Sequence, residues 1–134
     1  MGNSDLETVR VYEWMNWISG TLHGQAFGGL LRPQRFSDDE RAFEGIKEKG
    51  RKSVEECFEK VEGDLQLGGG FAVGGSFSAV DAYLYVFWRW GVGMGIRMGE
   101  RFPRFGRLVG EVVKRGAVGR ALEAEGVESF VSVV

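Results

Sequence analysis

Residues 75–90, which read GSFSAVDAYLYVFWRW, contain the pattern on which the predicted fold depends. Ser78 and Asp81 have the three-residue spacing of an N-terminal capping box, with Asp in place of the usual Glu. The residues from 82 to 88 are almost uninterruptedly apolar. A helix that is apolar on all sides belongs in the interior of a bundle. The stretch therefore predicts a central buried helix from Ala79 to about Trp90, capped by Ser78 and Asp81.

Two further helices are expected before this central helix. Ser4 and Glu7 have capping-box spacing, and apolar residues follow at steps of three and four, which predicts a helix from about Asp5 to Gln25. The pair Gly28-Gly29 is expected to end it. A second capping pattern at residues 37–40 starts another helix, which runs to Leu65 before three glycines. We expect its internal glycines to bend or weaken it; they are Gly45, Gly50 and Gly63.

Two helices are expected after the central one. Glycines crowd residues 91–99 and predict a frayed helix end and a turn. Pro103 suits the first position of a helix that reaches Val113, and a last helix, Ala117–Glu125, is closed by Gly126. The tail, residues 130–134, is apolar enough to dock. The chain is thus expected to be one all-α domain, residues 1–134, built as a bundle of five to six helices.

Composition excludes several classes of function. The chain has 134 residues, of which 43% are hydrophobic and 27% charged, and its formal net charge is −2, without the positive charge of a nucleic-acid binder. No apolar run reaches the ~18 residues that suggest a membrane span, and the N-terminus has no secretory signal. We therefore expect a cytoplasmic protein that binds neither nucleic acid nor membrane.

Metal and disulfide chemistry are not expected. The sequence has one cysteine, Cys57, and one histidine, His23, so it can form neither an internal disulfide nor a cluster of soft metal ligands. Cys57 lies among helically spaced apolar residues, which predicts a buried, inert thiol.

The run from Phe77 to Leu84, with Arg89 and Trp90 after it, also resembles a known family. It is similar to the motif that opens the core helix in the C-terminal helical domain of glutathione S-transferases of the beta-like bacterial and fungal type. The resemblance extends over nearly the whole chain, in matches at residues 13–18 (EWMNWI), 22–23 (LH), 32–33 (RP) and 121–127 (ALEAEGV). In that family an N-terminal thioredoxin-like domain holds most of the glutathione. The residues before Asn16 leave no room for it, so we expect a stand-alone helical domain.

His23 is the candidate catalytic residue. Imidazole titrates near neutral pH and can act as a general base. The resemblance implies that this histidine lies beside the thiol of glutathione, but the acidic residue and the lysine that accompany it in the family are here Thr21 and Gly24. A functional His23 and a polar residue on a helix edge both remain open.

Four aromatic residues, together with His23, are the candidate ligand-binding residues. They could form a wall for a flat hydrophobic ligand, and the resemblance implies that the Arg-Trp position lies near the hydrophobic substrate pocket. Helically spaced aromatic residues can equally be ordinary core. The four are Tyr12, Phe27, Trp88 and Trp90.

Three interpretations of function follow from this resemblance. The first is a stand-alone helical domain that binds a partner protein or a small hydrophobic ligand. The alternative is a glutathione-dependent transferase or isomerase, which works with a separate thioredoxin-like subunit or through its aromatic pocket. The third is a truncated product without separate function. We expect the isolated chain to be inactive in glutathione conjugation. We also expect apolar area, including Trp14 or Trp17, to be exposed for a homodimer or for a thioredoxin-like or other protein partner.

Overall fold

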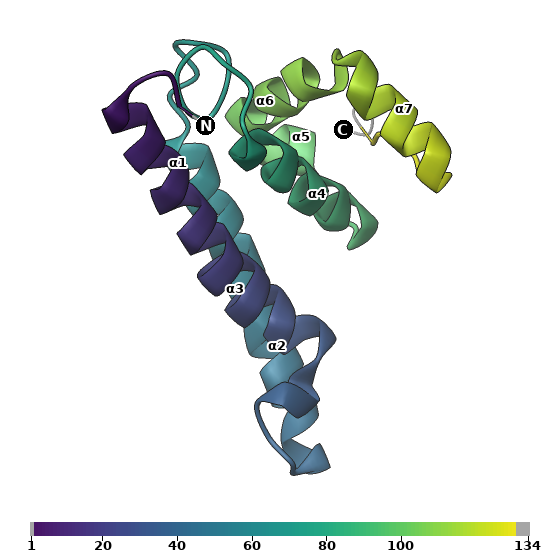
Figure 1. Cartoon of the computed structure of the whole chain (residues 1–134). Coiled ribbons are helices and arrows are strands. Elements are labelled where there is room, and N and C mark those ends of the chain that lie inside the picture. Colours follow the sequence, from purple (N-terminus) through teal and green to yellow (C-terminus); the bar gives the residue numbers. More distant parts are fainter. Residues whose placement is uncertain (1, 131–134) are drawn as a thin grey trace.

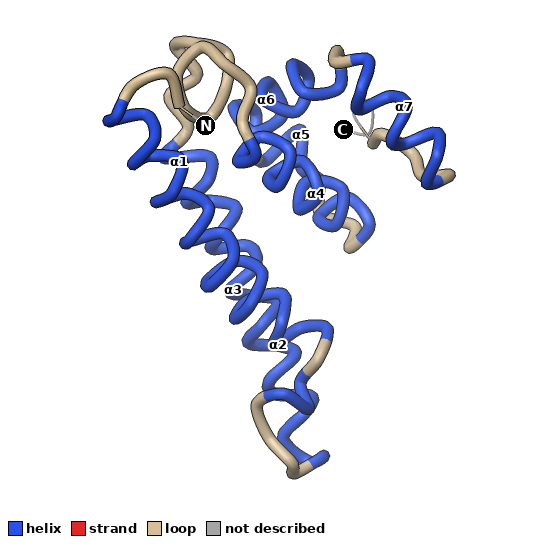
Figure 2. The backbone as a smooth tube through the Cα atoms, in the orientation of Figure 1, coloured by secondary structure: helices blue, strands red, loops and turns tan. Residues whose placement is uncertain are grey.

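The computed structural model describes residues 2–130, and their regular structure is entirely helical (Figure 2). This confirms the all-α prediction. No helix within these residues is long and apolar enough to cross a membrane. The α-helices are α1 (Asp5–Trp17), α2 (Gly28–Leu31), α3 (Phe43–Asp64), α4 (Ala79–Gly93), α5 (Met98–Arg101), α6 (Pro103–Val113) and α7 (Gly116–Glu125). They are joined by a π-helix, η1 (Ile18–Phe27), and by the 3₁₀ turns η2 (Pro33–Arg35) and η3 (Glu40–Ala42).

The first half of the chain is a long helical hairpin. The segments α1, η1 and α2 follow one another without a break, and α3 returns beside them (Figure 1). The predicted helix end at Gly28-Gly29 is therefore wrong, because both glycines are helical and buried. They lie where α2 packs against α3, and a Cβ atom on Gly50 of α3 would stand only 2.5 Å from the backbone nitrogen of Leu30. The glycines here permit close contact between two backbones.

Helix α3 is continuous through its three glycines, so they do not interrupt it. Its start differs from the prediction. The Asp39 side chain accepts a hydrogen bond from the backbone N–H of Arg41 at 3.0 Å, which caps the short turn η3, and α3 itself begins only at Phe43. The capping pattern at residues 37–40 therefore belongs to the short turn that precedes α3 and not to α3 itself.

The capping box of α4 is present as predicted. The hydroxyl of Ser78 accepts from the N–H of Val80, and the Asp81 carboxylate accepts from the N–H of Ser78 at 2.7 Å. The same carboxylate accepts from the N–H of Ala72 at 2.8 Å, which ties the preceding loop to the helix. Asp81 is fully buried. The helix continues to Gly93, three residues beyond the predicted end.

Helices α6 and α7 confirm two local predictions. Pro103 occupies the first turn of α6, which packs against α4, and Gly126 closes α7 in the left-handed conformation, with φ 64°. No residue of α7 is buried. The segment after α7 returns to α4, where Trp88 Nε1 donates to the carbonyl oxygen of Phe130 at 3.1 Å. The predicted docking of the tail is thus confirmed for Phe130; residues 131–134 lie outside the described part of the chain.

Candidate functional site

His23 lies in the π-helix η1, within the segment that the sequence predicts to be one continuous helix. The C-terminal cap of η1 shows the wider hydrogen-bond spacing, because the N–H of Gly28 donates to the carbonyl of His23, five residues back. π-Helices are rare, and the short π-bulges found inside α-helices are frequent at functional sites. The His23 side chain is exposed, whereas its neighbour Leu22 is buried.

The His23 side chain packs against one face of α4. Its Nδ1 atom is 2.9 Å from Tyr83 Oη, and its ring lies edge-on to Phe87 and Trp90, with centroids at 5.5 and 5.8 Å. Tyr83, Phe87 and Trp90 are spaced four and three residues apart, so they share one face of the helix. Phe27 packs beneath, 5.3 Å from Phe87 and 5.1 Å from Trp90 between centroids. We call these five residues, His23, Phe27, Tyr83, Phe87 and Trp90, the His23 cluster.

The structure brings together three of the five predicted ligand-binding residues. His23, Phe27 and Trp90 belong to the His23 cluster, although Phe27 is only 1% exposed. Trp88 does not, because it is 1% exposed and packs edge-on against Phe105 at 5.2 Å between centroids. Tyr12 is 58% exposed on α1 and takes no part in the cluster. The predicted wall that includes Trp88 and Tyr12 is therefore wrong.

Sequence reasoning missed Tyr83 and Phe87 as members of the cluster. Both stand in the stretch quoted first and share a helix face with Trp90, but the apolar run around them has no periodicity that distinguishes this face from the others. Of the cluster, the accessible side chains are His23, which is exposed, and Tyr83 and Trp90, which are half-buried. Phe87 is fully buried and supports them from the core.

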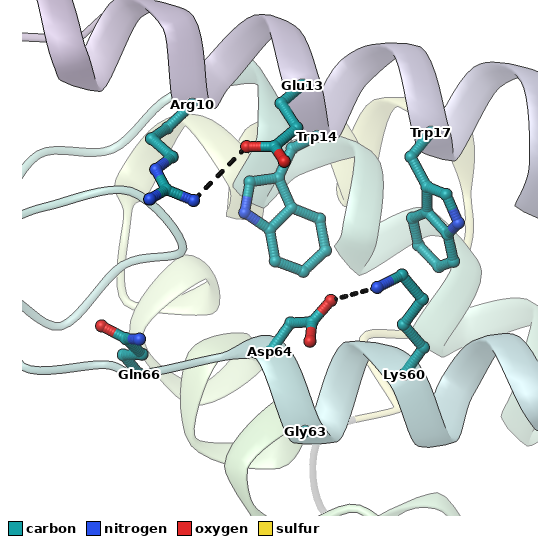
Figure 3. A pocket seen from close by; sticks show the side chains of 8 residues that line it. All are labelled: Arg10, Glu13, Trp14, Trp17, Lys60, Gly63, Asp64 and Gln66. Atoms are coloured by element: carbon teal, nitrogen blue, oxygen red, sulfur yellow. Dashed lines mark hydrogen bonds and ion pairs between the residues drawn. The ribbon is translucent and has the colours of Figure 1, made fainter.

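A second feature is a groove between α1 and α3, with a volume of about 460 Å³ (Figure 3). Figure 3 shows the indole rings of Trp14 and Trp17 pointing from α1 toward α3. Both tryptophans are half-buried, so part of each ring is accessible in the groove, and the predicted exposure of apolar area for a partner stays a prediction. Two ion pairs line the groove: Arg10 with Glu13 at 3.4 Å, and Lys60 with Asp64 at 2.6 Å. We call this feature the α1–α3 groove.

A cavity of about 620 Å³ continues from this groove and shares Trp17 and Lys60 with it. Cys57 lines the cavity, but it is only 8% exposed, and burial raises the pKa of its thiol. A high pKa keeps a thiol protonated and unreactive. Within residues 2–130, no three His, Cys, Asp or Glu side chains are grouped so that they could hold a metal ion.

A family model described as the glutathione S-transferase C-terminal domain matches residues 30–115, which is more than half of the chain. The chain belongs to this family. The matched range includes Tyr83, Phe87 and Trp90, whereas His23 precedes it.

A solved structure has the same fold as this glutathione S-transferase C-terminal domain protein. It is the crystal structure of a glutathione transferase homologue from Sulfitobacter with bound glutathione, with a TM-score of 0.83 and 23% sequence identity. The alignment covers 96% of the present chain and 60% of the other, so this chain spans about three fifths of its structural neighbour. No curated protein matches the chain.

Proposed function

We propose that the chain binds a small hydrophobic ligand at the His23 cluster. The observation that carries this proposal is the combination of an exposed imidazole with two half-buried aromatic rings, those of Tyr83 and Trp90. Aromatic side chains supply apolar contact area, and a few polar groups orient the ligand.

A ligand titration tests this proposal. The probe is phenylnaphthylamine, an uncharged fluorescent aromatic compound. Replacing Trp90 with Leu is expected to weaken its binding about tenfold, since loss of aromatic contact area at the centre of a site costs ~1 kcal/mol or more. Tyr12→Ser is the matched control, because Tyr12 is an exposed aromatic residue outside the cluster. Equal affinity in the wild type, Trp90→Leu and Tyr12→Ser would contradict the proposal.

A second candidate function is glutathione chemistry together with a thioredoxin-like domain. It is favoured by the structural neighbour, which contains bound glutathione and is longer than this chain. In such an assembly the His23 cluster would meet the thiol end of glutathione, and the thioredoxin-like domain would supply the other contacts. The reaction would be a glutathione-dependent transfer or isomerisation.

The isolated chain is expected to show no conjugation of glutathione to chlorodinitrobenzene above the uncatalysed rate. Conjugation needs a thiolate at neutral pH and a rigid frame that points the sulfur at the electrophile. A general base contributes about 100-fold to 10,000-fold, but only with the thiol within hydrogen-bond reach. Any weak affinity for glutathione, measured by calorimetry, is expected to be lost in His23→Ala. Robust conjugation by the wild-type chain that is lost in His23→Ala would contradict this prediction and favour an enzymatic function over ligand binding alone.

We also propose that the α1–α3 groove associates with a second copy of the chain or with another protein. The groove carries both signs of charge, in Arg10 and Lys60 and in Glu13 and Asp64, and the half-buried tryptophans lie between them. A surface with both signs of charge can complement itself across a two-fold axis.

Light scattering at tens of micromolar is expected to give the mass of a dimer. Lys60→Glu should shift the chain toward monomer, because it leaves three acidic side chains around the groove with one basic one. Lys52→Glu, which changes an exposed lysine outside the groove on the same helix, should not. A strictly monomeric wild type that captures no other protein would count against association.

A further inference from the structure

We infer that Tyr83 is a positioning residue, which donates its hydroxyl proton to Nδ1 of His23 and so places the proton of the neutral imidazole on Nε2. His23 then offers a hydrogen-bond donor to a ligand and cannot accept a proton at that atom. The ligand class follows: an aromatic or apolar body that carries an anionic or other acceptor group. This inference rests on the proposed ligand binding at the His23 cluster and specifies its chemistry.

The direction of the hydrogen bond follows from the two groups that share it. The atoms Nδ1 and Oη are 2.9 Å apart, which is hydrogen-bond distance. A neutral imidazole has one N–H and one nitrogen with a free lone pair, whereas a phenol can donate or accept. The phenol O–H is a stronger acid than a neutral imidazole N–H, and the imidazole lone pair is a better acceptor than the phenol oxygen. The favoured arrangement is therefore O–H of Tyr83 donating to Nδ1.

The surrounding rings hold the imidazole in this orientation. Tyr83, Phe87 and Trp90 all meet it edge-on, at interplanar angles of 88°, 60° and 76°. A flipped ring would present a carbon atom to the Tyr83 hydroxyl and lose the hydrogen bond. Within residues 2–130, the hydrogen bond to this ring joins Tyr83 Oη to Nδ1 and does not involve Nε2, and the residue as a whole is exposed.

The proton position can be measured directly, because His23 is the one histidine in the sequence. The full chain is labelled with isotopic nitrogen in histidine, and its ring nitrogens are observed by NMR in alkaline buffer, where free imidazole is neutral. The wild type is expected to show the proton on Nε2. Tyr83→Phe keeps the ring and removes the hydroxyl, so the Nδ1 resonance should move toward that of a nitrogen without a donor. A proton on Nδ1 in the wild type, or unchanged nitrogen resonances in Tyr83→Phe, would overturn the inference.

Two dyes test the ligand class in the same alkaline buffer. Anilinonaphthalene sulfonate and phenylnaphthylamine share one aromatic skeleton and differ in the sulfonate. The wild type is expected to bind the sulfonate dye at least about tenfold more tightly than phenylnaphthylamine. This ratio corresponds to the free energy that a hydrogen bond to a charged group contributes. Tyr83→Phe should reduce this preference, while circular dichroism checks that the helices are intact.

Two substitutions at His23 separate the donor role from that of a base. His23→Gln keeps an N–H donor close to the position of Nε2 but cannot act as a base, so it should retain the preference for the sulfonate. His23→Leu should lose it. Equal affinity for the two dyes in the wild type, or loss of the preference in His23→Gln, would overturn the donor role. Binding of neither dye would refute the proposed function itself, while the NMR measurement would still decide the proton position.

Discussion

Replacing Gly50 with Ala is expected to lower the free energy of unfolding by about 2 to 3 kcal/mol, in the upper part of the usual range for overpacking a tight contact. The added Cβ would lie 2.5 Å from the backbone nitrogen of Leu30 and 2.9 Å from the carbonyl carbon of Gly29. Both are backbone atoms of α2, so no side chain can rotate to make room. The two helices would have to move apart at this contact.

The same helix offers two matched controls for this substitution. A Cβ on Gly45 or on Gly63 would meet no atom within 4 Å. Each substitution to Ala should stabilise the chain by about 0.5 to 1 kcal/mol, because Ala loses less backbone entropy in a helix. Urea denaturation of the three variants measures the difference. A Gly50→Ala midpoint equal to that of Gly45→Ala would show that α2 and α3 are not in this close contact.

Replacing Asp81 with Ala is expected to cost about 3 kcal/mol or more. The carboxylate is fully buried and accepts hydrogen bonds from the N–H groups of Ala72 and Ser78, at 2.8 and 2.7 Å. Each donor left unsatisfied in the interior costs about 1 to 3 kcal/mol. The substitution also detaches the loop before α4 from the start of that helix.

Ser78→Ala is the matched comparison within the same capping box. In the wild type the Ser78 hydroxyl accepts a hydrogen bond from the N–H of Val80 at 3.3 Å, and loss of such a cap costs about 1 kcal/mol of stability. Denaturant unfolding should therefore separate the two variants clearly. Hydrogen exchange at the Ala72 amide should accelerate in Asp81→Ala and remain slow in Ser78→Ala. Equal destabilisation by both substitutions would mean that the bond to Ala72 contributes nothing.

Several elements of the fold could be predicted because they depend on nearby residues. The capping box of Ser78 and Asp81, Pro103 at the start of α6 and Gly126 at the end of α7 each act through hydrogen bonds or backbone angles within a few positions. The buried residues of α6, which are Phe105, Leu108, Val109 and Val112, recur at helical spacing in the sequence. Such features can be predicted from the sequence because the residues that form them are only a few positions apart.

The role of the glycines could not be predicted from neighbouring residues alone. In isolation, Gly28-Gly29 resembles a helix end and Gly50 resembles a weak point in a helix. In the structure these residues lie where α2 packs against α3, and at Gly29 and Gly50 the missing side chains allow the two backbones to approach. The packing partner distinguishes this role from that of Gly45, which lies in the same helix but where an added Cβ would meet no atom within 4 Å.

The candidate site likewise has a part that could be predicted from the sequence and a part that depends on tertiary packing. The sequence by itself determined that His23 and Trp90 were candidate residues and that α4 would be a buried helix. It could not assign Tyr83 and Trp88 to their faces, because a helix that is apolar all round has no periodicity to orient it. The tertiary structure decided this: α6 packs on the side of Trp88, and η1 brings His23 to the side of Tyr83. The π-helix η1, which packs against α3, supplies the remaining two members of the cluster, His23 and Phe27.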